Sequence, residues 1–440
     1  MADLTLPPPP LDEATATRSF SLNRGQGTGI FLGVLGLLAI VGIAPNITGD
    51  TRAFWFEAPP DPVKISFDPP TLVIAIGVIY LLVGAASVFL QDRLGPWITR
   101  LQVFAAALFI PLILATALGR SGSPGTNVIN LLDEALVLAT PYALGSMTGL
   151  WSERSGIINI GIEGMMLAAA GVGYMTYAVT GSAQGGGWLW FSILIAILVG
   201  GALALLLAVL AIEFQVNQIV AGVVINIFAL GLTGFLRSQV IVESGASSGQ
   251  STKEFGLPLL SDIPLFGKEF FTGRPLYFCM YLVVFLTWLV MFRTAWGLRV
   301  RACGENPHAA ETLGINVITT RYLSVLVGGF IAGLAGAWFS MEQTAKFEDN
   351  MTSGAGFIAL AAMIFGKWTP WGAFGGALLF GFSRALQSRL QFLDVDVNGF
   401  SIPSEFWQSL PFLVTIVVVA GALGRSIPPA SEGQAYRPSK

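Results

Sequence analysis

Long apolar segments restrict what this chain can fold into more than any other feature of its sequence. A helix needs about 20 mostly apolar residues to cross roughly 30 Å of hydrocarbon. Twelve segments approach or exceed that length, and they lie near residues 29–47, 71–90, 101–118, 128–150, 157–180, 188–212, 217–240, 275–292, 321–341, 355–367, 371–390 and 405–424. Charged residues make up only 11% of the chain, against about 25% in a soluble domain. The sequence therefore predicts an all-α polytopic membrane protein with about 10–12 transmembrane helices.

One of these segments, 355–367, is too short for a straight span. With the segment at 371–390 it forms either two crossing helices or a re-entrant hairpin. The sequence leaves both arrangements open.

The distribution of basic residues predicts the orientation, because Lys and Arg favour cytoplasmic loops. With the N-terminus inside, 13 of the 23 basic residues fall on the cytoplasmic side, namely Arg18, Arg24, Arg93, Arg100, Arg154, Arg293, Arg299, Arg301, Arg321, Lys367, Arg425, Arg437 and Lys440. The opposite connections at 48–70, 241–274 and 342–354 are rich in Asp and Glu. Both termini are therefore predicted to be cytoplasmic.

The chain divides into four predicted regions. Residues 1–28 are polar and lack the apolar core and cleavage site of a secretory signal, so we expect a disordered cytoplasmic tail followed by an uncleaved first span. Residues 29–125 form an N-terminal module of three helices. Residues 126–425 form a membrane core, and 426–440 form a second cytoplasmic tail.

Several kinds of chemistry are absent from the sequence. There is no G-x-x-x-x-G-K-[ST] phosphate loop, the single histidine is His308, and no metal-ligand spacing occurs. A net charge of −3 without a basic block gives no indication of nucleic acid binding. Cys279 lies in an apolar run and Cys303 in a predicted cytoplasmic loop, so a disulfide framework is not expected. These features favour a transport protein over an enzyme.

The loop at 293–321 contains the signals of a short helix. Asn306 is a good N-cap, Pro307 suits the first helical position, and Gly314 suits the residue after the end. The predicted helix has about two turns. It would present Ala309, Ala310 and Leu313 on one side, with His308 and Glu311 at the flank. Such a helix either docks on a partner or simply closes the loop.

Four stretches together resemble a known family. They are ERSGIINIGIEGMML at 153–167, NQIVAGVVINIFALGLTGFL at 217–236, GENPHAAETLGINV at 304–317 and FGKWTPWGAFGGALLFG at 365–381. They resemble permease subunits of ABC importers, in the branch serving simple sugars, nucleosides and branched-chain amino acids, and most of all the nucleoside and simple-sugar subgroup. The resemblance covers roughly residues 130–425, and the N-terminal module departs from the family pattern.

The resemblance implies a function and a set of partners. The chain would be a multi-pass protein of the bacterial cytoplasmic membrane that takes up nucleosides or related simple sugars. It would bind no cofactor itself, because a separate ATPase subunit would use ATP. A second, paralogous permease subunit, an external solute-binding lipoprotein and the lipid bilayer would be its other partners. The loop helix would couple to the ATPase through Glu305, Asn306, Pro307, Ala309, Ala310, Glu311 and Gly314.

Polar residues within the spans are the candidates for the solute pathway. A charge within a span usually faces a bundle interior or a watery cavity, so Glu163 is a candidate, supported by Asn159 and the nearby glycines. The alternative is an acid that only fixes helix packing. Asn226 lies deeper than Asn217 on one predicted span and is the better candidate, although an interhelical hydrogen bond would equally explain it.

Three further residues lie near span ends. Asp133, next to Glu134, is a candidate for the entrance to the pathway. Trp368 is a candidate for stacking on a solute, but an interfacial aromatic belt is the more common role of such a residue. Glu342 is expected at a solvated outer rim.

Three other functions stay open. A proton-coupled secondary transporter would use Glu163 as a relay, and a branched-chain amino acid permease would use the same fold for a different solute. A structural or channel-like protein would leave the loop at 293–321 without a partner.

Overall fold

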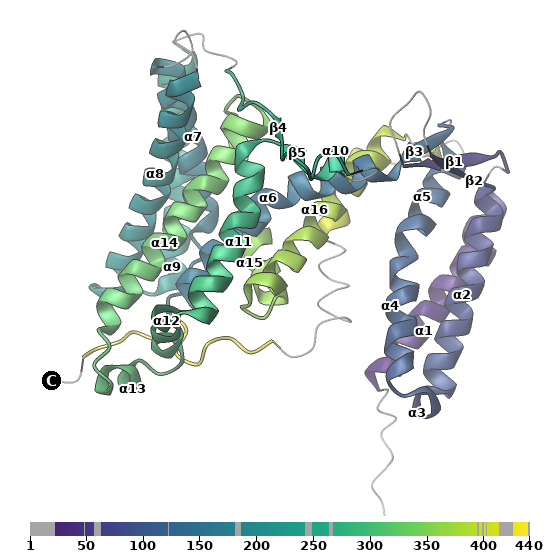
Figure 1. The fold of residues 1–440 in the computed structure, drawn as a ribbon, viewed down its shortest axis with the longest axis horizontal. Helices are drawn as coiled ribbons and strands as arrows, with labels where there is room; N and C mark the ends of the chain where they lie inside the picture. The colour runs from purple at the N-terminus through teal and green to yellow at the C-terminus, as the bar shows by residue number, and fades with distance from the viewer. Residues whose placement is uncertain are drawn as a thin grey trace, which may run out of the picture. The chain divides into compact units, whose positions relative to one another are not determined.

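The computed structural model describes residues 23–438 except 48, 57–62, 122, 181–185, 243–248, 264–266, 394–395, 398–399, 402 and 413–425. The chain forms two compact units, one of residues 1–52 and 67–120 and the other of residues 53–66 and 121–440. Within the described ranges, nine helices are long and apolar enough to cross a membrane. The polytopic helical prediction is therefore confirmed (Figure 1).

The first unit is a small helical bundle. Its elements are α1 (Arg24–Leu37), η2 (Leu38–Ile43), η3 (Ala44–Asn46), α2 (Pro69–Phe89), α3 (Gln91–Leu94), α4 (Pro96–Ala107) and α5 (Phe109–Arg120). Asp68 begins α2 by accepting a hydrogen bond from the Thr71 backbone N–H at 3.1 Å. Glycines allow α1 and α2 to pack closely, since a Cβ on Gly84 would lie 2.6 Å from the Gly29 carbonyl oxygen.

Short strands supplement the helices in the connections. β1 (Arg52–Trp55), β2 (Lys64–Phe67) and β3 (Gly125–Asn127) form a sheet in the order β2-β1-β3, with Ala53 opposite Gly125 in a parallel pair. Two antiparallel pairs join β4 (Phe255–Gly256) to β5 (Thr272–Gly273) and β6 (Asp396–Val397) to β7 (Phe400–Ser401). The purely α-helical prediction missed these pairs because two to four residues give no readable alternation.

The second unit contains the longer helices. They are α6 (Val128–Glu153), α7 (Ile162–Thr180), α8 (Gly186–Ile212), α9 (Gln218–Leu236) with η4 (Arg237–Val242), α11 (Pro275–Arg293), α14 (Val317–Ala337) with η5 (Trp338–Gln343), α15 (Ala355–Phe365) and α16 (Pro370–Phe392). Shorter helices are α10 (Gly267–Phe270), α12 (Ala295–Glu305), α13 (Pro307–Thr312) and α17 (Ser404–Gln408). Most of the last predicted span, 405–424, lies outside the described residues.

The helix α7 is the most enclosed span of this unit. Protein buries 83% of its apolar window, against 28% for α9. Small residues make this possible: a Cβ on Gly173 would lie 2.8 Å from the Ala196 Cβ, and one on Gly171 would lie 2.7 Å from Thr233. The middle of α7 is consequently packed closely against both α8 and α9.

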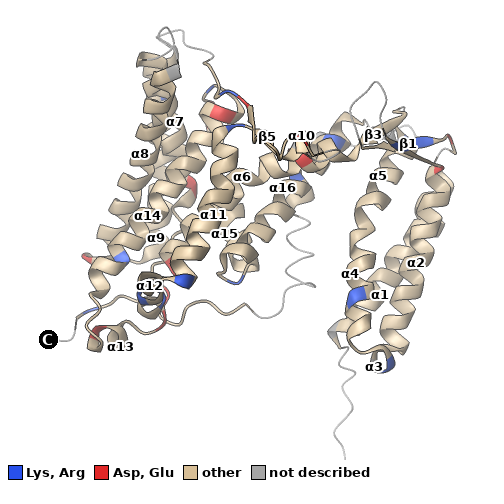
Figure 2. Ribbon diagram, in the orientation of Figure 1, with Lys and Arg blue, Asp and Glu red and all other residues tan. Residues whose placement is uncertain are grey.

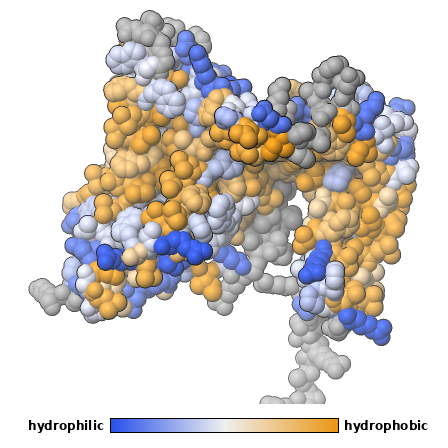
Figure 3. Space-filling view, viewed as in Figure 1, coloured by the Kyte–Doolittle hydropathy of each residue, from blue (hydrophilic) through white to orange (hydrophobic). Residues whose placement is uncertain are grey.

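Charge and hydropathy follow the pattern of membrane helices within each unit. Lys, Arg, Asp and Glu gather at helix ends and loops, whereas the middle parts of the helices are largely uncharged (Figure 2). The visible faces of the helices are correspondingly apolar over most of their length (Figure 3).

Candidate functional site

The candidate site is built around a break between α6 and α7. The chain leaves the helix after Glu153 and re-enters it at Ile162, and Gly156 adopts the left-handed region with φ of +95°. The backbone N–H of Ile158 donates to the Gln218 side chain of α9 at 2.7 Å. Three predicted pathway residues, Asn159, Glu163 and Asn226, meet at this break.

Glu163 lies in the first turn of α7 and reaches the beginning of α15. Its Oε1 accepts hydrogen bonds from the Thr352 hydroxyl at 2.6 Å and the Gly354 N–H at 2.8 Å, and its Oε2 accepts one from the Gly356 N–H at 2.6 Å. The side chain is buried, with 7% exposure. The carboxylate therefore caps the N-terminus of α15, where free N–H groups and the helix dipole favour a negative charge.

Glycine at position 356 makes this approach possible. A Cβ there would lie 2.6 Å from the Glu163 Cα and 2.9 Å from its Oε2. The three contacts match the packing role that the sequence left open for Glu163. A carboxylate has about four lone-pair positions, so about one remains for another donor.

Asn226 of α9 holds the other side of the same turn. Its side chain accepts from the Gly164 N–H at 2.7 Å and donates to the Ile160 carbonyl at 3.0 Å. It thus satisfies two backbone groups that the helix break leaves without helical partners. Gly164 is required here because a Cβ would lie 2.8 Å from the Asn226 Cα.

Asn159 is fully buried in the break. Its side-chain amide donates to the Ser152 hydroxyl at 3.3 Å, while its Oδ1 has no hydrogen-bond partner. A buried acceptor without a partner destabilises the state that contains it by about 1–3 kcal/mol. This atom is consequently the least satisfied polar group of the site.

Trp368 lies at the opposite end of α6 from Asp133. Trp368 is 5% exposed, donates from Nε1 to the Glu153 carboxylate at 2.6 Å, and accepts on its carbonyl from Arg154 at 2.8 and 2.9 Å. Burial lowers the pKa of Arg154. Asp133 is partly buried in the second turn of α6, about 30 Å away along the helix axis. The structure therefore brings Trp368 to the start of the break, beside Glu153 and Arg154, but leaves Asp133 far from it.

The predicted loop helix is confirmed as α13. Asn306 Oδ1 accepts from the Ala309 N–H at 3.0 Å, Pro307 starts the helix, and Gly314 has φ of +78°. The predicted face is wrong in one position, because Ala310 is 2% exposed and packs against Cys303, Val317 and Tyr436. Ala309 and Leu313 are exposed as predicted, and 80% of Leu313 is accessible. Glu305 and Asn306 are also exposed, and Glu311 is half-buried.

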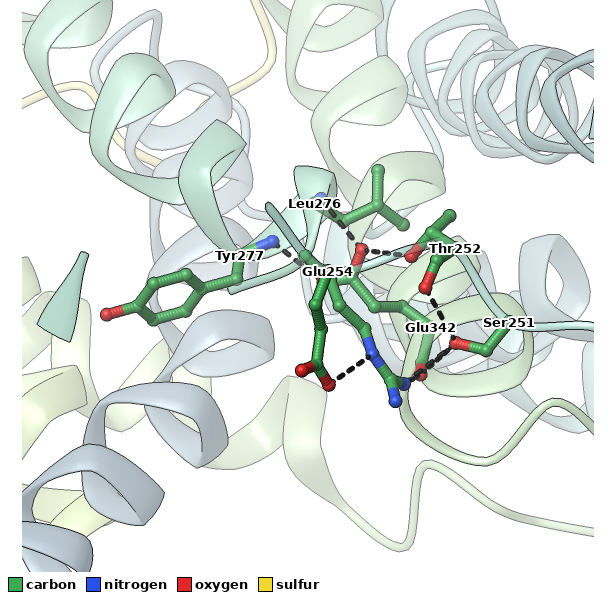
Figure 4. A network of polar contacts seen from close by, with 7 residues as sticks. Ser251, Thr252, Glu254, Leu276, Tyr277 and Glu342 are labelled. Atoms are coloured by element: carbon green, nitrogen blue, oxygen red, sulfur yellow. Dashed lines mark hydrogen bonds and ion pairs between the residues drawn. The ribbon is translucent and has the colours of Figure 1, made fainter. Parts of the chain in front are cut away.

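Glu342 was predicted at a solvated rim, and this is wrong. It is 2% exposed and caps α11, since its carboxylate accepts from the backbone N–H groups of Leu276 and Tyr277, both at 2.8 Å. Thr252 donates to it at 3.0 Å, and Arg274 donates to its carbonyl (Figure 4). Pro275 at the first helical position was the sequence signal that α11 begins here, and the backbone N–H groups that follow it need acceptors.

No group of three or more His, Cys, Asp or Glu side chains that could hold a metal ion occurs in the described part of the chain. Both cysteines are free, and burial raises the pKa of the Cys303 thiol. The arrangement is one of helix caps and interhelical hydrogen bonds around a broken helix, which is the construction of many membrane transporters.

Comparison with known proteins agrees with this class. The family described as "Branched-chain amino acid transport system / permease component" matches residues 131–419. The nucleoside ABC transporter permease NupC of Lactococcus lactis is 39% identical over 71% of this chain and 100% of its own length. The guanosine ABC transporter permease NupQ of Bacillus subtilis is 37% identical, over 70% and 96%. The putative glucose ABC transporter permease TsgC13 of Haloferax volcanii is 36% identical, over 67% and 92%.

This chain belongs to that permease family, and it is a transmembrane subunit of an ABC importer. Permease components of this kind act with ATPase and solute-binding components. No solved structure matches the chain.

Proposed function

We propose that this subunit imports nucleosides. The observation that carries the proposal is its similarity to a nucleoside permease and a guanosine permease along 100% and 96% of their lengths. Related simple sugars are the second candidate, because a relative named as a putative glucose permease is 36% identical. A proton-coupled transporter is not favoured, since energy in this family comes from an ATPase component.

The proposed topology has 12 spans in a bacterial cytoplasmic membrane, with both termini inside. Nine described helices supply nine of these spans. The helices α15 and α16 would supply two more, and most of the last predicted span, 405–424, lies outside the described residues. The 11 residues of α15 extend only about 16 Å, which is roughly half the hydrocarbon thickness. Its N-terminus, capped by Glu163, would therefore lie within the membrane.

The proposed partners follow from the two faces of the chain. The exposed side of α13, with Ala309 and Leu313, would enter a groove of the ATPase subunit, which alone would bind ATP. A second, paralogous permease would complete the pathway, and an external lipoprotein would deliver the solute. This chain would hold no cofactor and catalyse no reaction.

The break between α6 and α7 would form part of the solute pathway. In the state described here Glu163 and Asn226 hold the break closed by five hydrogen bonds to neighbouring segments. Movement of α7 relative to α15 would release some of these groups, together with the Asn159 Oδ1, toward a nucleoside hydroxyl or base N–H. The hydrogen bonds gained by the solute would offset those lost by the protein.

Uptake by the reconstituted complex tests the proposal. Vesicles containing both permeases and the ATPase, supplied with the binding protein and ATP, should accumulate labelled guanosine or uridine. Unlabelled nucleosides should compete, whereas leucine should not. Accumulation of glucose alone would contradict the nucleoside assignment, and uptake driven by a proton gradient without ATP would contradict the importer mechanism.

A further inference from the structure

The C-terminal segment Ser426–Pro438 crosses one end of the helical core without forming a helix. Figure 1 shows it as the yellow trace that runs past α12 and α13. The sequence suggested only a polar tail here. Instead, Ser431 and Tyr436 are each 8% exposed, which makes the segment an integral part of the fold.

The segment is bonded to the end of α12, next to the coupling helix. The Ser431 N–H donates to the Gly304 carbonyl at 2.9 Å, and the Ser431 hydroxyl donates to the Glu305 carbonyl at 3.0 Å. The Ala430 N–H donates to the Glu305 carboxylate at 3.2 Å. Three hydrogen bonds thus fix the turn at residues 430–433 to the residues that immediately precede α13.

Tyr436 packs on the coupling helix itself. Its ring lies 5.3 Å from that of His308 and joins Ala310 in a small apolar cluster. Burial raises the pKa of Tyr436 to about 12, and a hydrogen bond with Glu311 contributes to the shift. A helix of six residues is unstable alone, so these contacts help to hold α13 in place.

The same segment is bonded to the break between α6 and α7. The Gly433 N–H donates to the Gly156 carbonyl at 3.0 Å. The carboxyl groups of Glu432 and Glu153 also lie beside each other. Gly433 has φ of +75°, and a Cβ on it would lie 2.7 Å from the Ile158 side chain.

Arg321 of α14 connects the contacts that the C-terminal segment makes beside α13 with those that it makes at the break between α6 and α7. It is 2% exposed, and its guanidinium donates to the Ser155 carbonyl at 3.1 Å and to the Gln434 carbonyl at 3.3 Å. The same group lies 5.7 Å from the Tyr436 ring. By comparison, the direct ion pair between Arg154 and Glu305 is long, at 3.9 Å, and half of Glu305 is exposed, so it is weak.

We propose that residues 426–437 are a strap that mechanically fastens the coupling helix to the break between α6 and α7. Displacement of α13 by the ATPase would pull on Tyr436 and Ser431 and, through Gly433, on residues 156–158. Those residues lead directly to Asn159 and Glu163. The inference rests on the proposed function, because it requires an ATPase at α13.

The test compares uptake with ATP hydrolysis in the assembled complex. Gly433→Val detaches the strap from the break, and Tyr436→Ala detaches it from the coupling helix. A chain ending at Arg425 removes the strap altogether. Ile427→Ala is the matched control, since this strap residue is 74% exposed.

All variants should hydrolyse ATP in the complex that assembles, and Gly433→Val, which leaves the contacts at α13 intact, should copurify with the ATPase as the wild type does. The strap variants should transport at least about ten-fold less nucleoside per ATP hydrolysed than the wild type, while the control keeps the wild-type ratio. The ratio does not depend on how much complex assembles. A wild-type ratio in Gly433→Val and Tyr436→Ala would overturn the strap. A wild-type chain that never binds an ATPase would instead overturn the proposed function.

Discussion

At the scale of single residues, buried carboxylates decide how the helices begin. Glu163 on α7 caps α15, and Glu342 at the end of η5 caps α11. In both cases a charged side chain of one helix satisfies the backbone donors of another. Within hydrocarbon no water would replace such an acceptor, so a carboxylate is an effective cap there.

Replacing Glu163 by Gln should destabilise the protein. The amide keeps one acceptor oxygen, but its NH2 group would face the N–H of either Gly354 or Gly356, where no acceptor exists. We expect a loss of about 1–3 kcal/mol in stability, seen as a lower melting temperature of the purified complex.

The matched control is Glu348→Gln, because Glu348 is 58% exposed and pairs with Lys346 at the surface. It should change stability by less than about 1 kcal/mol. If Glu163→Gln has the melting temperature of the wild type but a higher KM for uptake, the carboxylate contacts the solute and its capping of α15 does not stabilise the protein.

At the scale of elements, the two sides of α13 have different tasks. Ala310 faces inward, whereas Ala309 faces outward. Since consecutive residues on a helix differ by about 100° in direction, one side can pack while the next remains available for a partner.

Ala309→Arg should leave the fold intact and weaken ATPase association by about ten-fold or more, measured by copurification. Ala310→Arg should instead lower the melting temperature, because it inserts a charge beside Cys303 and Val317. Ala295→Arg, at an exposed position at the start of α12, is the control and should bind the ATPase normally. Equal binding by Ala309→Arg and the control would show that this face does not dock.

At the scale of the whole molecule, the proposed topology assigns each loop to one side of the membrane. The proposed topology places the loop containing Lys253 outside and that containing Arg299 inside. Both residues are exposed, so both positions are accessible to a labelling reagent. Cys303 is unsuitable as a reporter because it is fully buried.

In a chain with both native cysteines replaced, Lys253→Cys should react with an impermeant thiol reagent added to intact cells. Arg299→Cys should react only after the membrane is opened. The reverse pattern would invert the proposed topology, and labelling of both from outside would exclude an odd number of spans between them.

The sequence by itself determined the features that depend on residues close together along the chain. Apolar runs predicted nine helices that the structure contains, and Asn306, Pro307 and Gly314 predicted the ends of α13, because span length and helix caps are local signals. The candidate role of Glu163 also came from a local signal, a charge within an apolar run. The contacts that define that role came from residues 352–356, about 190 positions further along the chain.

Only the tertiary structure decided which polar groups are satisfied and by what. Glu342 is a cap rather than a rim residue because α11 begins beside it, and Ala310 is buried because Tyr436 packs there. The C-terminal strap is largely polar and contains two Ser and two Pro, so its composition resembles a tail. Its backbone hydrogen bonds to Gly156 and Gly304 link segments more than a hundred residues apart, and such pairings depend on the packed core that brings those segments together.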